Sequence, residues 1–529
     1  MASFAWLIVA VAALLTLSPV TSEARTLVWA RASDALSLDP HAINEGPTNT
    51  LLHQIYEPLV VRDARGKLLP ALAVSWSSGD DPRIWTFKLR QNVVFHDGTP
   101  LTADDVVFSL ERARRPTSDM KTRMAGITRI EKVDEQTVEV ETSGRDPLLP
   151  MQLTDIFIMS AKWAADFAAV EPQNYRSGAT AYAALKANGT GPFMLVSRVP
   201  GRETRLRRHK QYWTELPAID VLIYRVVPDS KARVEALLKG DADFIQDVPV
   251  DMVPALGKNP VITVKSGPEN RVIFLGLNVT SRLRSGDKPD SPNPMFELRV
   301  RQAIDLAIDR RAIQRDVMKG QSIPTAVAAP PTINGYPQRL DHLRPPQIDK
   351  AKELLKLAGF AGGFTLNLDC PNDRYVNDAA ICAAIANQLK VVGITMNVRL
   401  RTKAEHFRVV RNRTSDVYLL GWGVPTFDSE YLFRHLYHSA PVDRPAWNGT
   451  GYEDPAIDRL IESISTEINL VKRNLLIADI WWRVHAQRIY IPIHVQTLTY
   501  AMRKGIDIAV DISDAPKIKF AKLAPVNPN

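Results

Sequence analysis

Residues 70–113 read PALAVSWSSGDDPRIWTFKLRQNVVFHDGTPLTADDVVFSLERA. Within them, residues 85–89 (WTFKL) alternate apolar and polar side chains, which is typical of a half-buried strand. The Asp-Gly pair at 97–98 marks a turn. Thr102 and Asp105 have the spacing of a helix capping box, and apolar side chains follow them at helical intervals. The stretch therefore predicts a strand, a turn and a helix in succession.

Similar patterns continue along the chain. Residues 127–133 and 137–142 predict an antiparallel hairpin, because a turn signal separates two strand-like segments. Residues 364–369, 378–392 and 394–400 predict strand, helix and strand, a βαβ unit with parallel pairing. A mixture of βαβ units and hairpins predicts α/β lobes rather than a single sheet.

The stretch at 70–113 also resembles the signature of the family 5 extracytoplasmic solute-binding proteins, which deliver peptides, nickel chelates and related solutes to ABC importers. Seven further fragments occur in the order that this family has, and they span nearly all of the chain after residue 24. The fragments are GTGPFML from Gly189, GDADFIQDVP from Gly240, FLGLNVTS from Phe274, LRVRQAIDLAIDRRAI from Leu298, DKAKELLKLAGF from Asp349, DVYLLGWG from Asp416 and IPIHVQTLTYAMRKG from Ile491.

The resemblance implies an α/β periplasmic-binding-protein fold with two lobes and an extra domain, the discontinuous lobes being joined by a hinge. Carried onto this chain, lobe I combines residues 25–60, 188–278 and 498–529. The extra domain, inserted in lobe I, runs over 61–187, and lobe II over 279–497.

The amino-terminal end has the pattern of an export signal. Phe4 to Leu17 are apolar apart from Thr16, and this run is shorter than the ~20 residues that cross a bilayer. Ser22 and Ala24 supply the small residues of a cleavage site, so residues 1–24 predict a signal peptide and a mature start at Arg25. A signal anchor is the alternative. No cysteine lies near this site, so we expect a periplasmic protein without a lipid anchor.

The composition is that of an ordinary globular protein, with 45% hydrophobic and 23% charged residues. The formal charge of +8 is compatible with nucleic-acid binding. The most basic stretch, residues 198–210, ends beside Tyr212 and Trp213, aromatic residues of the kind that a nucleic-acid site could use. That stretch reads equally well as a hairpin with exposed alternate positions, and we expect no nucleic-acid partner. The chain lacks the G-x-S-x-G, H-E-x-x-H and P-loop motifs, so we expect no enzyme.

The chain has two cysteines, Cys370 and Cys382, in a compartment that permits disulfides. If they are bridged, they tie the end of a predicted strand to the following helix. Two buried free thiols are an equally good reading, because the sequence does not show whether their Cβ atoms face each other.

The segment GWGVPTFDSEYLF from Gly421 follows a predicted strand, and in similar proteins it forms a loop that lines the ligand pocket. The resemblance therefore makes Trp422 an aromatic ligand contact, with Phe427 and Asp428 behind it. Peptide-binding relatives commonly carry an acidic residue three places after this tryptophan, whereas this chain has Val424. Capture of a simple dipeptide through its amine is therefore in doubt.

Arg374 follows the predicted strand 364–369, at the place where dipeptide-binding relatives hold the ligand carboxylate. Its guanidinium offers a planar fork of donors that suits a carboxylate. Local pairing with a neighbouring aspartate is the alternative. Tyr375 is a weaker companion, and Asn44 and Glu45, in the segment that opens the first lobe, are expected to face the cleft.

His435 and His438 lie three residues apart, which would place both rings on one helical face. Two ligands make an incomplete metal site, so we expect no bound metal and no cofactor. The family resemblance thus implies a monomeric receptor for a peptide or peptide-like anionic solute, with an ABC permease and ATPase as partners. A receptor for a metal chelate such as nickel is one alternative, and a peptidase-like enzyme or a periplasmic chaperone is another.

Overall fold

The computed structural model describes residues 24–175, 180–285, 290–439 and 447–524. The predicted leader lies outside these residues. Within the described part of the chain, an 11-stranded sheet has the order β15-β14-β16-β12-β17-β11-β1-β10-β9-β8, and β13 adds to β17. No helix in these ranges is long and apolar enough to span a membrane.

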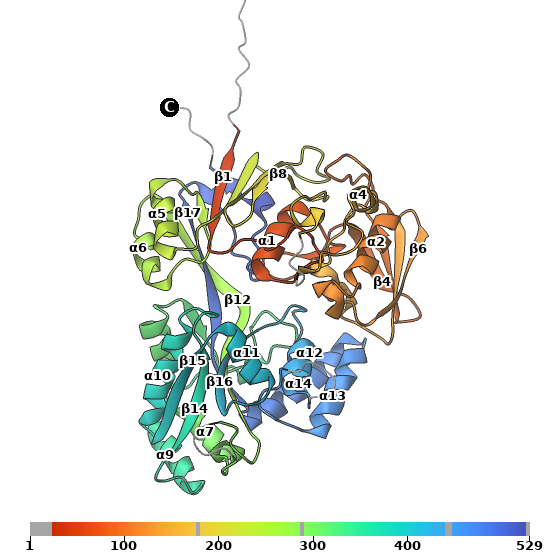
Figure 1. The fold of residues 1–529 in the computed structure, drawn as a ribbon. Helices are drawn as coiled ribbons and strands as arrows, with labels where there is room; N and C mark the ends of the chain where they lie inside the picture. The colour runs from red at the N-terminus through yellow and green to blue at the C-terminus, as the bar shows by residue number, and fades with distance from the viewer. Residues whose placement is uncertain (1–23, 176–179, 286–289, 440–446, 525–529) are drawn as a thin grey trace, which may run out of the picture.

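Two long antiparallel strands, β12 (Ile262–Leu277) and β17 (Tyr490–Arg503), run through both halves of the molecule (Figure 1). Their register changes between Pro268 and Val272, so that residues 269–271 of β12 lie opposite Gln496 alone. A bulge of this kind bends a strand and increases its twist. Because the bulge lies where the sheet passes from the upper to the lower half, we call residues 269–271 the hinge bulge.

The upper half contains the first described residues, and helices lie on both sides of its sheet (Figure 1). Its core gathers Trp29, Leu52 and Tyr224 with Tyr500 and Ile518, so the carboxyl-terminal segment returns to it. Its elements are β1 (Thr26–Arg31), α1 (Gly46–Ile55), β8 (Phe193–Val199), β9 (Glu203–Arg208), β10 (Val221–Val226), α5 (Ser230–Lys239), β11 (Phe244–Ile245) and α6 (Val253–Gly257). The basic stretch 198–210 lies mainly in the hairpin of β8 and β9, as predicted.

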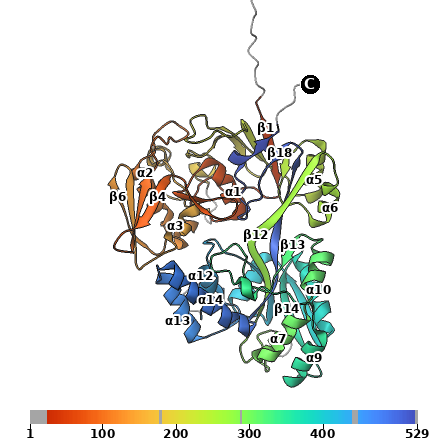
Figure 2. The same ribbon diagram turned by 180° about the vertical axis from the view of Figure 1, so that it is seen from behind.

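A separate four-stranded antiparallel sheet lies beside the upper half, in the order β4-β5-β7-β6 (Figure 2). Its elements are β4 (Ala73–Ser78), β5 (Ile84–Leu89), α2 (Ala103–Ala113), β6 (Ile127–Asp134), β7 (Thr137–Thr142), α3 (Leu149–Gln152) and α4 (Ala161–Asp166). The predicted capping box is present, because Thr102 N–H donates to Asp105 Oδ2 over 2.9 Å and Asp105 N–H donates to Thr102 Oγ1 over 3.4 Å. The predicted hairpin of residues 127–142 is confirmed as well. A small hairpin, β2 (Val60–Arg62) and β3 (Leu68–Pro70), precedes this sheet.

In the lower half, helices cover both faces of the sheet. Helices α7, α9 and α10 pack on one core, and α11 to α14 pack on another. The elements are α7 (Leu298–Ala307), α8 (Arg310–Ala312), β13 (Ser322–Pro324), α9 (Ile348–Leu357), β14 (Phe364–Pro371), α10 (Asp378–Lys390), β15 (Ile394–Arg401), α11 (Lys403–Arg411), β16 (Val417–Gly423), α12 (Ser429–Leu432), α13 (Pro455–Thr466) and α14 (Leu470–Gln487). The predicted βαβ unit is β14-α10-β15, and its strands are parallel.

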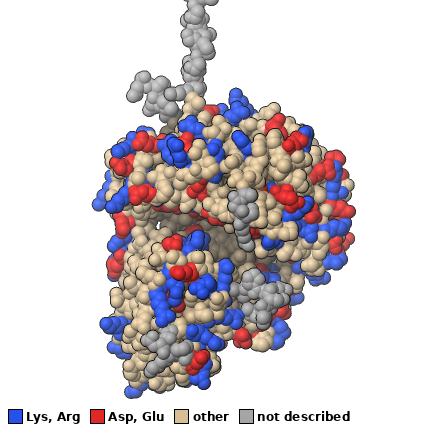
Figure 3. Space-filling view, viewed as in Figure 1, with Lys and Arg blue, Asp and Glu red and all other residues tan. Residues whose placement is uncertain are grey.

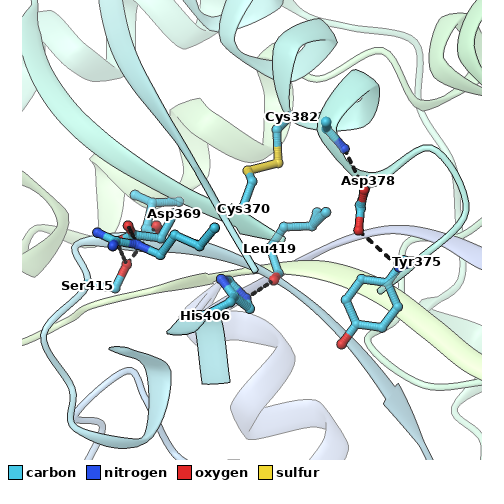
Figure 4. Close-up of a disulfide and its surroundings, with 11 residues drawn as sticks. Asp369, Cys370, Tyr375, Asp378, Cys382, His406, Ser415 and Leu419 are labelled. Atoms are coloured by element: carbon cyan, nitrogen blue, oxygen red, sulfur yellow. Dashed lines mark hydrogen bonds and ion pairs between the residues drawn. A yellow bond between two sulfur atoms is a disulfide. The ribbon is translucent and has the colours of Figure 1, made fainter. Parts of the chain in front are cut away.

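Cys370 and Cys382 form a disulfide (Figure 4). Of the two alternatives that the sequence left open, a disulfide or two buried free thiols, the first is present. Their Cα atoms are 6.6 Å apart, and the bond joins the end of β14 to α10. The loop that connects these two elements carries Arg374 and Tyr375. Asp378 holds the same loop from the other end, because its Oδ2 accepts the backbone N–H groups of Arg374 (3.1 Å) and Tyr375 (3.0 Å).

Candidate functional site

A cavity of about 530 Å³ lies between the two halves of the molecule, and Figure 3 shows the surface hollowed there. Its walls come from α1 and the carboxyl-terminal loop above, from the hinge bulge, and from the ends of β14 and β16 below. The lining includes Asn44, Asn49, His53, Arg123, Asp155, Glu269, Arg271, Arg374, Tyr375, Phe407, Trp422, Phe427, Tyr431, Trp447 and Lys517. A cleft between two lobes is where a small solute is most readily enclosed.

This cavity continues toward the extra four-stranded sheet. A second cavity of about 480 Å³ shares Asn44, Arg123, Pro425 and Tyr431 with the first. Its remaining walls come from residues 142–152 of the extra sheet and residues 426–466 of the lower half. The combined space exceeds what a single amino acid would fill.

The hinge bulge contributes charge to the cleft. Glu269 Oε1 accepts a hydrogen bond from Arg271 Nε over 2.8 Å, and its Oε2 accepts one from Gln496 over 2.5 Å. Burial would lower the pKa of Arg271, but Glu269 beside it raises that pKa overall. Partial burial and the nearby Arg271 cation lower the pKa of Arg374. Glu269 is therefore engaged by Arg271, and the Arg374 guanidinium lies near the pair as a second cation.

Arg374 has no ion-pair partner among the described residues, although aspartates lie on both sides of it in sequence. Asp378 is occupied by backbone N–H groups, and Asp373 Oδ1 accepts the backbone N–H of Lys403 over 2.6 Å. The guanidinium instead lies 5.2 Å from the ring centroid of Tyr375, whose hydroxyl donates to Gly421 O over 3.1 Å. Local pairing, the alternative reading of Arg374, is thus absent.

Aromatic side chains form the lower wall. Trp422 leaves the end of β16 and lies 5.7 Å from Trp447 and 6.0 Å from Tyr431, measured between ring centroids. Trp422 is 8% exposed and belongs to the core of the lower half, so it serves packing and the cleft together. Its indole Nε1–H has no hydrogen-bond acceptor among the described residues. A buried donor without a partner costs free energy until a solute supplies an acceptor.

The upper wall carries a charged network that begins on α1. His53 hydrogen-bonds Asp155 Oδ1 over 3.1 Å, and Arg123 pairs with Asp155 Oδ2 over 2.7 Å. Burial would raise the pKa of Asp155, but Arg123 and His53 hold it well below its usual range. Burial and the nearby Lys517 lower the pKa of His53 to about 4, so this histidine is neutral near pH 7.

Phe427 lies in the cleft region but packs between the two halves of the molecule. It has a left-handed backbone (φ 54°), and the Arg62 guanidinium lies 4.4 Å from its ring centroid. Arg62 also donates to Thr426 O over 3.0 Å, which adds a second contact between the halves. Phe427 therefore joins the two halves and also lines the cleft, so its expected contact with the ligand stays a prediction.

Gly66 provides the space for this contact. Its φ of 83° disfavours other residues, and a Cβ added there would lie 2.5 Å from Phe427 Cε1 and 2.8 Å from Ile512 Cδ1. We expect Gly66→Ala to push Phe427 away and to favour an open form with a larger radius of gyration. Small-angle scattering of the unliganded variant tests this, with Gly79→Ala as the control, because a Cβ at Gly79 meets nothing within 4 Å. An unchanged scattering curve for Gly66→Ala would contradict the role of Phe427.

Two residues expected to face the cleft do not line it. Asp428 is 1% exposed, and its carboxylate forms two hydrogen bonds to Arg473, of 2.6 and 2.7 Å. The same carboxylate caps α12 through Glu430 N–H. Glu45 is the cap of α1, because its Oε2 accepts the backbone N–H of Thr48 over 2.9 Å. Asn44 lines both cavities.

His435 and His438, the two histidines considered as metal ligands, contact different side chains. The His435 ring stacks on Tyr431 with centroids 4.1 Å apart, and its Nδ1 hydrogen-bonds Tyr431 O over 2.8 Å. His438 Nε2 lies 3.5 Å from Glu462. Among the described residues, no group of three or more His, Cys, Asp or Glu side chains could hold a metal ion.

Sequence reasoning missed several cleft residues. Arg271 lies in a polar break, GPENR, inside a strand that continues as the apolar run VIFLGL, and this break was a readable sign of the bulge. His53 is four residues after Asn49 on α1, a helical interval that could have paired them. No local sequence pattern marked Asp155, Trp447 or Lys517 as cleft residues. They reach the cleft only because the fold brings distant segments together.

Known proteins resemble this chain over nearly its whole length. The glutathione-binding protein GsiB of Escherichia coli (strain K12) is 26% identical over 496 residues, which cover 91% of each chain. The nickel-binding periplasmic protein of the same strain is 25% identical over 549 residues, covering 97% of this chain and 99% of that protein.

Solved structures share the fold. HbpA2 from Haemophilus parasuis aligns with a TM-score of 0.81 at 22% identity, over 94% of this chain and 99% of its own. The periplasmic binding protein DppA from Helicobacter pylori, in complex with the peptide STSA, aligns with a TM-score of 0.73 at 23% identity, over 94% of this chain and 98% of its own. The two-lobed periplasmic-binding-protein fold expected from the sequence is thus confirmed.

A sequence profile of the middle region of one family covers residues 67–444, which is more than half of the chain. That match includes the extra sheet, the hinge bulge and the cleft loops at Arg374 and Trp422. The chain belongs to the bacterial extracellular solute-binding proteins, family 5.

Proposed function

We propose that this solute-binding subunit of an ABC importer captures a peptide-like solute that carries at least one anionic group. The observation that carries this proposal is the charge at the hinge wall, where Glu269 pairs with Arg271 and Arg374 has no ion-pair partner among the described residues. A carboxylate on the solute would complete this group with a bidentate or bridged hydrogen bond. Trp422, Tyr375 and Asn44 are the other proposed solute contacts.

Three places after Trp422 the chain has Val424, where peptide-binding relatives commonly carry an acidic residue. Val424 is fully buried, and its backbone carbonyl accepts a hydrogen bond from Asn270 over 2.7 Å. The proposed solute therefore depends on its anionic group more than on a free α-ammonium. Its apolar part would lie against Trp422, Trp447 and Phe407.

Lobe closure is the proposed mechanism. A solute that contacts both lobes stabilises the closed state in proportion to its preference for that state, and the closed form then docks on the permease and its ATPase. We propose that the lobes meet at residues 269–271 and at Gln496, close to the boundaries expected at 278 and 497. The segments 25–60, 188–278 and 498–529 would move together with the extra domain, against 279–497.

A metal chelate is the second candidate solute. The nickel-binding relative favours it, and the carboxylates of a chelator would suit the same pair of arginines. We further propose export through residues 1–24, with a mature periplasmic protein that starts at Arg25 and carries no lipid. We also propose that each copy captures solute on its own as a monomer and that catalysis forms no part of this role.

The proposal is tested on the mature protein purified from its own cells. Mass spectrometry of the solute released by denaturation is expected to find a carboxylate-bearing peptide-like compound, and adding it back should decrease the radius of gyration. A nickel chelate in that fraction would favour the second candidate. If no solute is recovered and no pooled cell extract causes compaction, the receptor function is contradicted. The chaperone and peptidase hypotheses would then remain.

A further inference from the structure

Helix α14 exposes a continuous apolar stripe. Val471, Leu475 and Trp482 are 73%, 69% and 67% exposed, and Ala478 between them is exposed too. Intervals of four, three and four residues place all of them on one face of the helix. The opposite face is the buried one, carrying Ile477, Ile480, Trp481 and Val484. Figures 1 and 2 place α14 beside α12 and α13, on the side of the lower lobe that lies below the extra sheet.

This stripe is unusual for a soluble surface. Scattered exposed apolar residues need no explanation, but contiguous ones with a regular interval mark an interaction surface. The alternation of four and three residues is that of the a and d positions through which two helices pack. Exposed Ile468, three residues before Val471, continues the interval just ahead of the helix. The spacing therefore indicates a helix as the partner.

The charges beside the stripe identify that helix. Lys472, Asp479 and Arg483 each follow a stripe residue by one position, so they lie along one edge of it. Glu467 reaches the same edge, because it pairs with Lys472 over 2.6 Å. Along the chain the edge reads negative, positive, negative, positive. In an antiparallel pair this edge meets the same edge of the other copy in reversed order, so every charge meets the opposite sign. In a parallel two-fold pair it would meet the other edge, where Leu470, Asn474 and Trp481 precede stripe residues and carry no charge.

The apolar positions suit the same arrangement. In an antiparallel pair Leu475 packs near Ala478 of the other copy, and Val471 packs near its Trp482. A groove of about 270 Å³ lies at the Trp482 end; Leu340, Leu343 and Pro345 border it together with charged side chains such as Arg339 and Arg344. Ile468, at the amino-terminal end of the other copy's stripe, would reach the apolar border of this groove.

We propose that α14 is a self-association surface, on which a second copy of this chain packs antiparallel about a two-fold axis. One helix stripe and its edge bury less than the ~800 Å² per partner of a stable complex. The pair is therefore weak and reversible, and it forms only at high protein concentration. The monomer expected from the sequence is its dilute form.

Sedimentation velocity of the mature wild-type chain, from low-micromolar to near-millimolar concentration, is expected to show a reversible monomer–dimer equilibrium. The variants K472E and D479K each place like charges across the two-fold axis and should weaken self-association by about 10-fold or more. An equimolar mixture of the two variants restores every opposite-sign contact, so it should associate at least as well as the wild type. Lys472 and Asp479 are exposed, and thermal unfolding checks that both variants stay folded.

Crosslinking gives a second measurement. The two native cysteines are bonded to each other, so Leu475→Cys introduces a single free thiol. A short bis-maleimide should couple Leu475→Cys into dimers much faster than Leu357→Cys, which places an equally exposed thiol on α9. A monomer at every concentration with equal crosslinking of both variants would overturn the proposal. Loss of transport in Leu475→Glu without any dimer would also overturn it and assign the stripe to the permease.

Discussion

Replacing Arg374 by alanine is expected to weaken solute binding by about 30-fold or more. The guanidinium is held by a loop that the Cys370–Cys382 disulfide and Asp378 fix at both ends, and it has no ion-pair partner among the described residues. Removing one partner of a desolvated charge pair costs ~2 to 5 kcal/mol, and the lower figure already corresponds to about 30-fold in Kd. Calorimetry with the solute recovered from the purified protein measures this change.

Two comparisons make the Arg374 result specific. Arg311→Ala removes an exposed arginine outside the cleft and should leave the affinity unchanged. A carboxyl-amidated form of the solute should bind the wild-type protein as weakly as the intact solute binds Arg374→Ala. The Arg374→Ala variant should bind the amidated and the intact solute with equal affinity. Equal affinity of wild type for both forms, or loss of binding when only the amine is blocked, would contradict an anionic requirement at Arg374.

The elements of this fold were predictable wherever the pattern was local. The capping box at Thr102, the hairpin over residues 127–142 and the β14-α10-β15 unit all rest on intervals within one short segment. The disulfide was not decided in this way, because its formation depends on how the end of β14 faces α10. A spacing of twelve residues permits a bond and does not require one.

The candidate site was predictable only in part, for a related reason. Family resemblance located the two loops at Arg374 and Trp422, but it did not show which side chains in them are already satisfied. Phe427 packs against Arg62 and Gly66, which precede it by more than 360 residues in the sequence. A residue's partner from another lobe leaves no trace in the local pattern, so ligand contact and structural contact look alike in sequence.

Asp428 shows the same point most sharply, and Asp428→Ala is expected to destabilise the protein by about 3–5 kcal/mol. Its carboxylate and the Arg473 guanidinium are 2% and 3% exposed as side chains, so the variant leaves a buried cation without its partner. The carboxylate also accepts Asn334 Nδ2–H over 2.9 Å and caps α12. The midpoint and slope of urea unfolding, measured without solute, give the loss of free energy.

The double variant Asp428→Leu with Arg473→Met distinguishes the buried charge from the lost cap. It removes both charges, so it should recover a large part of the stability that Asp428→Ala loses, because an apolar pair avoids the desolvation of an unpaired ion. The folded fraction of Asp428→Ala should bind solute within about 3-fold of wild type, a change of less than ~1 kcal/mol. A large loss of affinity with unchanged unfolding would instead return Asp428 to the solute site. If Asp428→Ala is destabilised but keeps its affinity, Asp428 has a structural role and holds the loop after Trp422 in place. Its two hydrogen bonds to Arg473 favour this role.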